Sequence, residues 1–258
     1  MKEYFDLKNN VAVITGASTG LGLQMAHALA KCGSNVVLLA RREELIKENA
    51  NKISELYNVK TLAIRCDITS TTDVQNAVKK TIDTFGKVDI LVNNAGTGHV
   101  GKAEDITDEQ FENEVRIDLT GTFKCAREFG KEMIKANYGR IINIASMYGL
   151  VGNMVSGAEA TPYHAAKGGV VNLTRALAAE WGKHGITVNA ICPGYFETPL
   201  TKETLETEWF KEYAKSTIPV GRYGHTRELD TTVIFLSSKM STYVNGVNLP
   251  VDGGYTCI

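Results

Sequence analysis

A glycine-rich stretch at residues 15–22, Thr-Gly-Ala-Ser-Thr-Gly-Leu-Gly, restricts the possible folds of this chain more than any other feature. An apolar run typical of a buried strand, residues 11–14, precedes it, and a segment with helical spacing, residues 21–31, follows it. Gly16 allows a sharp turn, and the two later glycines let a diphosphate approach backbone N–H groups at the positively polarised end of a helix. Because the spacing is Gly-x3-Gly-x-Gly and not the commoner Gly-x-Gly-x-x-Gly, this stretch alone could still be an ordinary turn.

Apolar strands and helical segments alternate along the rest of the chain. Strands are expected at 35–40, 61–66, 88–92, 140–145 and 186–191, and helices at 43–57, 71–85, 108–135 and from residue 161 onwards. These strands are too apolar for burial on one face, and the segments between them are long enough for crossover helices. The sequence therefore predicts an α/β fold with a Rossmann-type doubly wound parallel sheet, and the length of 258 residues predicts a single domain.

The composition counts against several classes of protein. The 28 Lys and Arg residues balance 29 Asp and Glu residues, so neither a nucleic acid nor a membrane is a predicted partner. The N-terminal residues lack the apolar core of a signal peptide, and no apolar run approaches the ~20 residues of a membrane span. The five cysteines show no Cys-x-x-Cys spacing, and no group of histidines and carboxylates has metal-ligand spacing. We therefore expect a soluble, cytoplasmic protein with reduced thiols and no metal.

Two adjacent arginines, Arg41 and Arg42, follow the second strand. In a dinucleotide-binding fold the adenosine ribose lies here, where an acidic residue pairs with the 2′-hydroxyl of NAD and an arginine suits the 2′-phosphate of NADP. No acid stands at this point, so the sequence predicts NADP(H) as the preferred cofactor, with NAD(H) still possible. The alternative is that both side chains are solvated charges at the start of a helix.

Tyr163 and Lys167 stand four residues apart in a helix that is expected to begin at Thr161, its N-cap, and Pro162. Both side chains therefore project from one helix face. A tyrosine alone has a pKa near ~10, and a neighbouring ammonium group lowers the pKa of the phenol, which improves it as an acid and base. Ser146, at the end of the fifth strand, can donate a hydrogen bond to a carbonyl oxygen. This set is what the reduction of a carbonyl group by a bound nicotinamide requires.

The pattern from residue 11 to residue 254 resembles that of the short-chain dehydrogenase/reductase family. The matching marks are Thr-Gly-x-x-x-Gly-x-Gly at 15–22, Asn-Asn-Ala-Gly at 93–96, Ser146, Tyr163-x-x-x-Lys167, Pro193-Gly194 with Thr198, and Val-Asp-Gly-Gly at 251–254. The resemblance implies that Tyr163 is the acid and base, that Ser146 orients the carbonyl group, and that Lys167 also binds the nicotinamide ribose.

The same resemblance implies a set of cofactor-binding residues, with Asp67 at the adenine. The set comprises Gly16, Ser18, Thr19, Gly20, Leu21, Gly22, Arg41, Arg42, Asp67, Ile68, Asn94, Ala95, Gly96, Tyr163, Lys167, Pro193, Gly194, Phe196 and Thr198. The residues expected to contact the substrate are His99, Ser146, Tyr148 and Tyr195, although His99 could also be an ordinary loop histidine.

Asp118 departs from the family pattern. Relatives carry a catalytic Asn in a segment like Val-Asn-Leu-x-Gly-x-Phe, whereas this chain has Ile-Asp-Leu-Thr-Gly-Thr-Phe at 117–123. An amide both donates and accepts hydrogen bonds and a carboxylate only accepts them, so the expected water relay must be rearranged or Asp118 must be protonated. We expect Asp118 to keep the relay role and count it as the fourth catalytic residue.

Two further segments are expected to shape the substrate site. Residues 195–224 have the length and aromatic content of a substrate lid with hinges at Gly221 and Gly224, although such aromatic residues also arise from simple packing. Residues 152–160 lengthen the interval between the serine and the tyrosine, and they either shape the substrate mouth or form an ordinary surface loop.

Residues 144–153 and 192–198 look most like those of gluconate 5-dehydrogenases and related sugar-acid enzymes. The expected function is NADP(H)-dependent interconversion of a secondary alcohol and a ketone, here 5-keto-gluconate, while 3-oxoacyl carrier-protein reduction or another ketone or hydroxysteroid reduction stays open. A different possible function is that of a non-catalytic regulator that binds the cofactor, and only the replacement at Asp118 supports it. The resemblance, together with a helix that is apolar on more than one side around Leu177 and Trp181, predicts a homotetramer.

Overall fold

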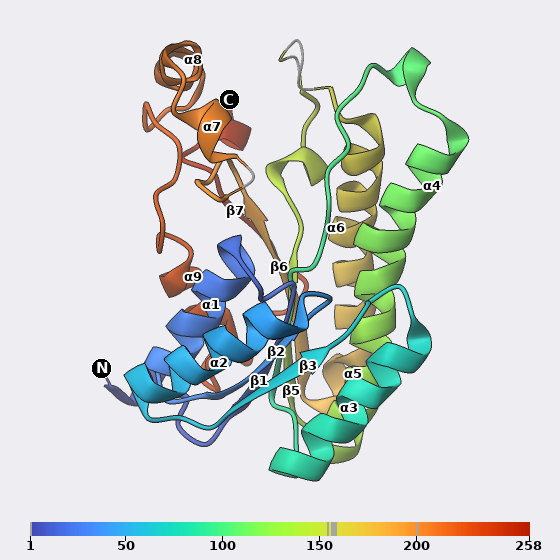
Figure 1. Ribbon diagram of the computed structural model, residues 1–258, viewed down its shortest axis with the longest axis vertical. Coiled ribbons are helices and arrows are strands. Elements are labelled where there is room, and N and C mark those ends of the chain that lie inside the picture. The colour runs from blue at the N-terminus through green and yellow to red at the C-terminus, as the bar shows by residue number, and fades with distance from the viewer. Residues whose placement is uncertain (1, 154, 156–158, 200) are drawn as a thin grey trace.

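Among the residues that the computed structural model describes, 2–153, 155, 159–199 and 201–258, seven parallel strands form one sheet (Figure 1). The strands are β1 (Val11–Thr15), β2 (Asn35–Ala40), β3 (Thr61–Arg65), β4 (Ile90–Asn93), β5 (Gly139–Ile144), β6 (Ile186–Pro193) and β7 (Asn248–Val251). Their order is β3-β2-β1-β4-β5-β6-β7, so the chain builds outward from β1 in one direction and then, from β4, in the other. This order confirms the predicted Rossmann-type doubly wound sheet in a single domain.

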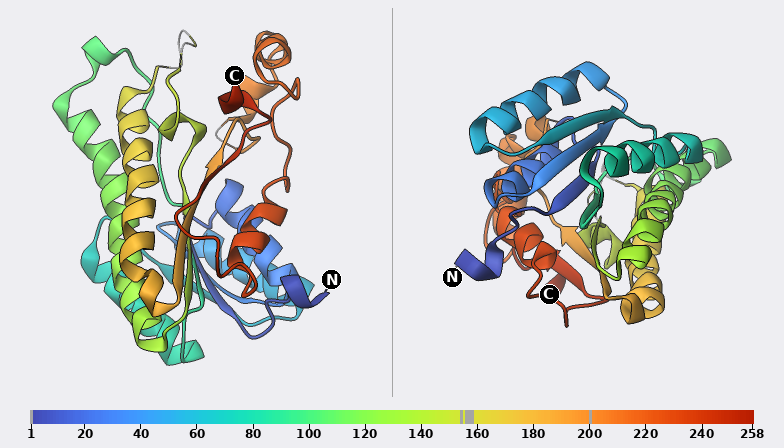
Figure 2. Two further views of the ribbon diagram at one scale, coloured as in Figure 1. Left: turned by 180° about the vertical axis from the view of Figure 1, so that it is seen from behind. Right: turned by 90° about the horizontal axis from the view of Figure 1, so that it is seen from below.

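Helices cover both faces of the sheet (Figures 1 and 2). One face carries α1 (Gly20–Lys31), α2 (Glu43–Tyr57) and α9 (Asp230–Ser237), and the other carries α3 (Thr71–Phe85), α4 (Asp108–Val115), α5 (Thr122–Ala136) and α6 (Thr161–Trp181). A buried apolar cluster joins each helix layer to the sheet. Two short helices, α7 (Lys202–Leu205) and α8 (Glu208–Thr217), lie beyond the carboxyl ends of the strands. None of the described helices has the length and apolar character needed to cross a membrane.

The helical stretch predicted at 108–135 is confirmed, and it contains a π-helical segment, Arg116–Gly121, between α4 and α5, in which the backbone winds more loosely. This segment contains Asp118, and π-helical turns recur at functional sites. Thr161 is the first residue of α6 and not its N-cap; Ala160 takes the N-cap position and has no side chain that could accept a hydrogen bond.

The residues that suggested a partner subunit are used within the chain itself. Leu177 and Trp181 are only 5% and 8% exposed, because they pack in the apolar cluster between α6, α5 and the sheet. The exposed large apolar side chains on the described helices of this layer are Phe111 of α4 and Phe123 of α5. The argument for a tetramer from Leu177 and Trp181 therefore does not hold.

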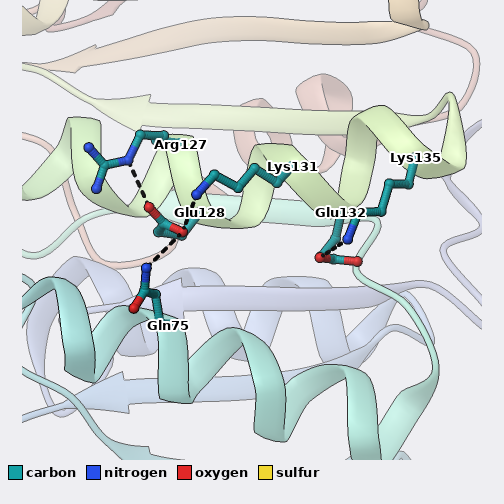
Figure 3. Close-up of polar contacts among 6 residues, drawn as sticks. All are labelled: Gln75, Arg127, Glu128, Lys131, Glu132 and Lys135. Carbon is teal, nitrogen blue, oxygen red and sulfur yellow. Dashed lines mark hydrogen bonds and ion pairs between the residues drawn. The ribbon is translucent and has the colours of Figure 1, made fainter.

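A polar contact fixes α5 against α3 (Figure 3). The carboxylate of Glu128 lies between the two helices and accepts hydrogen bonds from Arg127 and Lys131 on α5, each at 2.7 Å, and from Gln75 on α3 at 3.5 Å. Lys135 pairs with Glu132 one turn later.

Candidate active site

A cavity of about 830 Å³ opens at the carboxyl ends of the strands. It lies across the point where the strand order reverses, between β1 and β4, and open α/β sheets bind their ligands at this position. The lining contains every predicted cofactor residue except Gly22, namely Gly16, Ser18, Thr19, Gly20, Leu21, Arg41, Arg42, Asp67, Ile68, Asn94, Ala95, Gly96, Tyr163, Lys167, Pro193, Gly194, Phe196 and Thr198. Ser146, Tyr148 and Tyr195 line the same cavity, so one space brings together the predicted cofactor and substrate residues.

Gly22 has a packing role and lies outside the cavity lining. It is buried in α1, and a Cβ atom here would collide with the side-chain amide of Asn94 and lie 2.6 Å from the carbonyl oxygen of Gly16. The sequence motif therefore combines a glycine that shapes the loop with one that lets α1 approach Asn94. Spacing alone does not separate these two uses, because both need the absence of a side chain.

The turn between β1 and α1 fits a diphosphate group. Gly16 and Gly20 have left-handed backbone φ values of 65° and 61°, and a Cβ at Gly16 would lie 2.8 Å from the Cα of Ala95. No acidic residue stands in the first turn of α1, and the N-cap Thr19 accepts no hydrogen bond from the backbone. The first N–H groups of α1 are therefore left for an anion from the cavity, as the dipole of the helix favours.

Arg42 ties the end of β2 to this turn. Its Nη2 donates to Oγ of Ser18 at 2.7 Å and to Oγ1 of Thr19 at 3.0 Å. Arg41 beside it also lines the cavity and is exposed. The two guanidinium groups give this end of the cavity the positive charge that a 2′-phosphate would need.

Asp67 lies at the same end, together with Arg116, which the sequence analysis missed. Burial alone would raise the pKa of Asp67, but hydrogen bonds from the backbone and hydroxyl of Thr69 and the charges of Arg41 and Arg116 lower it. The ionised carboxylate can therefore accept a hydrogen bond from an adenine amino group. Arg116 belongs to the π-helical segment, and nothing in its sequence position shows that this segment reaches across to β3.

Ser146, Tyr163 and Lys167 all line this cavity. Oγ of Ser146 accepts the backbone N–H of Tyr148 at 3.1 Å, which leaves the hydroxyl proton available for donation into the cavity. Lys167 is buried, with Nζ 5.4 Å from the centre of the Tyr163 ring and donating to the carbonyl oxygen of Ile144 at 3.1 Å. The side chains that the sequence placed four residues apart thus meet as predicted.

Asp118 pairs directly with Lys167. Its Oδ2 lies 2.9 Å from Nζ of Lys167, and its Oδ1 accepts the backbone N–H of Thr97 at 2.8 Å. Burial would lower the pKa of Lys167, but the negative charge of Asp118, with further contributions from Tyr163 and Glu114, outweighs it and raises that pKa. Asp118 is fully buried and lies outside the cavity lining. At the position where relatives carry the asparagine of a water relay, this chain therefore has a carboxylate that is ion-paired with Lys167.

Aromatic side chains also line the cavity. The hydroxyl groups of Tyr148 and Tyr195 lie 2.6 Å apart, and burial raises the pKa of both, so each stays neutral and able to donate a hydrogen bond. Tyr195 packs edge-on against Phe210 of α8. His164, to which the sequence analysis gave no role, stacks on the Tyr148 ring with 4.4 Å between ring centres.

His99 does not lie with the other predicted substrate residues. It is half-buried outside the cavity lining, and its backbone N–H donates a hydrogen bond to the carboxylate of Glu114. In the expected lid, Leu205, Phe210, Ala214 and Ile218 form a small buried cluster. Positions 154, 156–158 and 200 lie outside the described residues, so the expectation for 152–160 stays a prediction.

Metal ligands are not gathered at this site. In the described parts of the chain, no three His, Cys, Asp or Glu side chains are placed to hold a metal ion. Of the acidic side chains near the site, Asp118 pairs with Lys167 and Asp67 lies at the adenosine end of the cavity. That the enzyme needs no metal remains a prediction.

Comparison with known proteins identifies the family. A family model described as enoyl-(acyl carrier protein) reductase matches residues 16–256. The chain is 37% identical to a 3-oxoacyl acyl-carrier-protein reductase of Rickettsia bellii, over 96% of this chain and 98% of that protein. It is 34% identical to a gluconate 5-dehydrogenase of Gluconobacter oxydans, over 98% and 97%. A crystal structure of a gluconate 5-dehydrogenase from Burkholderia cenocepacia, in complex with NADP and tartrate, superposes with a TM-score of 0.94 at 33% identity, covering 100% of this chain and 99% of that one. The chain therefore belongs to the short-chain dehydrogenase/reductase family, as an enzyme that acts on CH–OH groups.

Proposed function

We propose that this enzyme interconverts a secondary alcohol and a ketone with NADP(H), using Ser146, Tyr163 and Lys167. The observation that carries the proposal is that these three side chains and the phosphate-binding turn line one cavity. A bound nicotinamide would supply or take up the hydride. The test is oxidation of NADPH, with NADH alongside, in the presence of ketone substrates. No turnover with any ketone would instead favour the cofactor-binding regulator.

The chain's own residues manage the proton and the orientation of the carbonyl group. Ser146 donates its free hydroxyl proton to the carbonyl oxygen, since its lone pair already accepts from Tyr148. The O–H bond of Tyr163 breaks as its proton moves to that oxygen while the carbonyl carbon receives the hydride. The ammonium group of Lys167 stabilises the phenolate that remains. In the oxidation direction each step runs backwards.

NADPH is expected to be preferred over NADH because Arg41 and Arg42 stand at the adenosine end. We expect Arg42→Ala to raise the KM for NADPH by about 10- to 100-fold, in line with about 1.5–3 kcal/mol for a hydrogen bond to a charged group. The KM for NADH should change far less, since NADH carries no 2′-phosphate. Steady-state kinetics with both cofactors measures this, with Arg65→Ala as a control at an exposed arginine outside the cavity lining. Equal losses with NADPH and NADH would contradict the assignment.

The substrate is proposed to be a sugar acid, with 5-keto-gluconate as the first candidate. The support is the sequence likeness at 144–153 and 192–198 and the presence of gluconate 5-dehydrogenases among the relatives. The tyrosine hydroxyls at this end of the cavity can bind a chain of alcohol groups.

One observation favours a neutral ketone as the second candidate. Among the described residues that line the cavity, the cations other than Lys167 are Arg41, Arg42 and Arg116, and all three lie at the adenosine end. Lys167 is already paired with Asp118, so a substrate carboxylate would lack a free cationic partner. Comparing kcat/KM for 5-keto-gluconate and for a neutral ketohexose separates the two candidates. 3-oxoacyl substrates belong in the same panel, since a reductase of such substrates is among the relatives.

Residues 195–224 are proposed to act as a lid that the Tyr148–Tyr195 hydrogen bond holds over the substrate. We expect Tyr195→Phe to raise the KM for the ketone by roughly 2- to 10-fold, the equivalent of one neutral hydrogen bond, with little change in kcat. Tyr223→Phe is the matched control, because Tyr223 lies on the same segment but outside the cavity lining. If both variants changed the KM equally, the effect would come from packing of the lid and not from this hydrogen bond.

We further propose that the enzyme works as a cytoplasmic homotetramer. All five cysteines are free thiols, which agrees with a reducing compartment. The support for an oligomer is the family resemblance, together with the exposed Phe111 and Phe123.

A further inference from the structure

A second buried carboxylate, Glu114, lies behind the ion pair of Asp118 and Lys167. Glu114 stands on α4 four residues before Asp118, and only 1% of its surface is exposed. One carboxylate oxygen, Oε1, is buried and has no hydrogen-bond partner among the described residues, while the carboxylate accepts the backbone N–H of His99. A buried carboxylate with an unpartnered oxygen is unfavourable when it is ionised, so this group calls for an explanation.

The charges around Glu114 explain why it holds a proton. Asp118 from the π-helical segment and Lys167 and Tyr163 from α6 are the ionisable groups facing this cluster, and His99 approaches it through its backbone. Asp118 takes the direct ion pair with Lys167, Glu114 has no ion pair of its own among the described residues, and neighbouring like charges do not both ionise readily. Burial, followed by the charge of Asp118, raises the pKa of Glu114 to about 7, although Lys167 and the His99 N–H act in the opposite direction.

We propose that Glu114 and Asp118 share one proton at neutral pH, and that this proton resupplies Lys167 after Lys167 has reprotonated Tyr163. The inference rests on the proposed function, since it concerns the proton that ketone reduction consumes. Glu114 touches neither the cavity nor the reacting atoms, so it is a positioning residue that acts through Asp118.

The proton of the Tyr163 hydroxyl ends on the new alcohol oxygen, and the phenolate takes a proton from Nζ of Lys167. The resulting amine takes the shared proton by way of Oδ2 of Asp118, 2.9 Å away, which leaves both carboxylates ionised. A proton from water then restores the pair.

Access to water is provided by the loop after β4. Gly96, Thr97 and Gly98 are exposed, whereas Asp118 and Glu114 are buried. Thr97 donates its backbone N–H to Asp118, and a Cβ at Gly96 would lie 2.8 Å from Oδ2 of Asp118. Gly96 and Thr97 also line the cavity, so the water that restores the proton reaches the pair from the cavity side of this loop.

The first test is a pH titration of the protein labelled with ¹³C in the glutamate carboxyl groups and followed by NMR. Wild type is expected to show one glutamate that titrates with a midpoint near 7, and Glu114→Gln should remove that signal. Asp118→Asn should move the midpoint at least one pH unit lower, because the like charge beside Glu114 is gone. Glu55→Gln, at an exposed glutamate, is the control and should leave the midpoint unchanged. The proposal would be overturned if Glu114 stayed ionised down to pH 5, or if the Asp118→Asn variant had the same midpoint as wild type.

The second test measures the pH profile of kcat for ketone reduction. In wild type kcat should decline as the pH rises through about 7, because the pair then lacks its proton. Glu114→Gln should lower kcat at pH 6 by about 10-fold, less than the 10²- to 10⁴-fold of a direct proton donor, and should abolish this inflection while KM stays the same. An inflection that survives in Glu114→Gln would refute the resupply role.

A stability measurement adds a readout that does not depend on turnover. The pKa of Glu114 is raised in the folded state, so the stability from its bound proton is full below the unfolded pKa of about 4.5 and is lost as the pH rises through about 7. Wild type should therefore lose stability relative to Glu114→Gln between about pH 5 and pH 8 in urea unfolding. If the midpoint near 7 appears but no ketone is reduced, the proposed function is wrong, while the inference that Glu114 and Asp118 share one proton is still supported.

Discussion

Replacement of Tyr163 by phenylalanine is expected to lower kcat by about 10²- to 10⁴-fold, because it removes the proton that must reach the carbonyl oxygen. The substitution deletes one oxygen atom and keeps the ring, so the cavity shape and the position of Lys167 over that ring should persist. Binding of NADPH, followed by quenching of tryptophan fluorescence, should therefore change little. The measurement is single-turnover NADPH oxidation with saturating ketone, which isolates the chemical step.

Tyr148→Phe and Tyr243→Phe are the matched controls for this result. Tyr148 lines the same cavity but lies 6.5 Å from Tyr163, ring centre to ring centre, and Tyr243 is fully exposed. We expect Tyr148→Phe to act mainly on the KM for the ketone and Tyr243→Phe to have no effect. A Tyr163→Phe enzyme that retains most of its kcat would show that another group supplies the proton.

The sequence was sufficient for the sheet and most of the cavity lining because both depend on local patterns. A buried parallel strand requires a continuous apolar run, and each such run ends at the same edge of the sheet, where ligands bind. Ser146 could therefore be placed beside Tyr163 although 17 positions separate them. Tyr163 and Lys167 followed from helical geometry alone.

The residues that the sequence did not reveal depend on packing between distant elements. Arg116 and Glu114 looked like ordinary charged residues of an amphipathic helix, since nothing local marks a π-helical segment or a buried acidic position. Glu114 does carry a weak signal, because it stands four residues before Asp118 and a helix puts both on one face. His99 follows the Asn-Asn-Ala-Gly motif in sequence but lies outside the cavity lining, so its contact with substrate stays a prediction.

Asp118→Ala is expected to reduce the free energy of unfolding by about 3–5 kcal/mol, the typical effect of leaving one partner of a buried ion pair alone. Lys167 would keep its hydrogen bond to Ile144 but would lose the counter-charge 2.9 Å away, and the backbone N–H of Thr97 would lose its acceptor. Urea unfolding at pH 7 measures the difference. Asp83→Ala, which removes one partner of the exposed pair with Lys79, is the control and should change stability by less than about 1 kcal/mol.

Asp118→Asn removes the negative charge of Asp118 and keeps the size of its side chain. The amide oxygen can still accept the Thr97 N–H, and an ionised Glu114 would supply the negative charge that Lys167 then lacks. We therefore expect Asp118→Asn to lose about 1–2 kcal/mol, clearly less than Asp118→Ala. The double variant Glu114→Gln with Asp118→Asn removes both carboxylates, so it should lose much more than the sum of its single effects. Additive losses would mean that the two carboxylates do not replace each other, and that Lys167 depends on Asp118 alone.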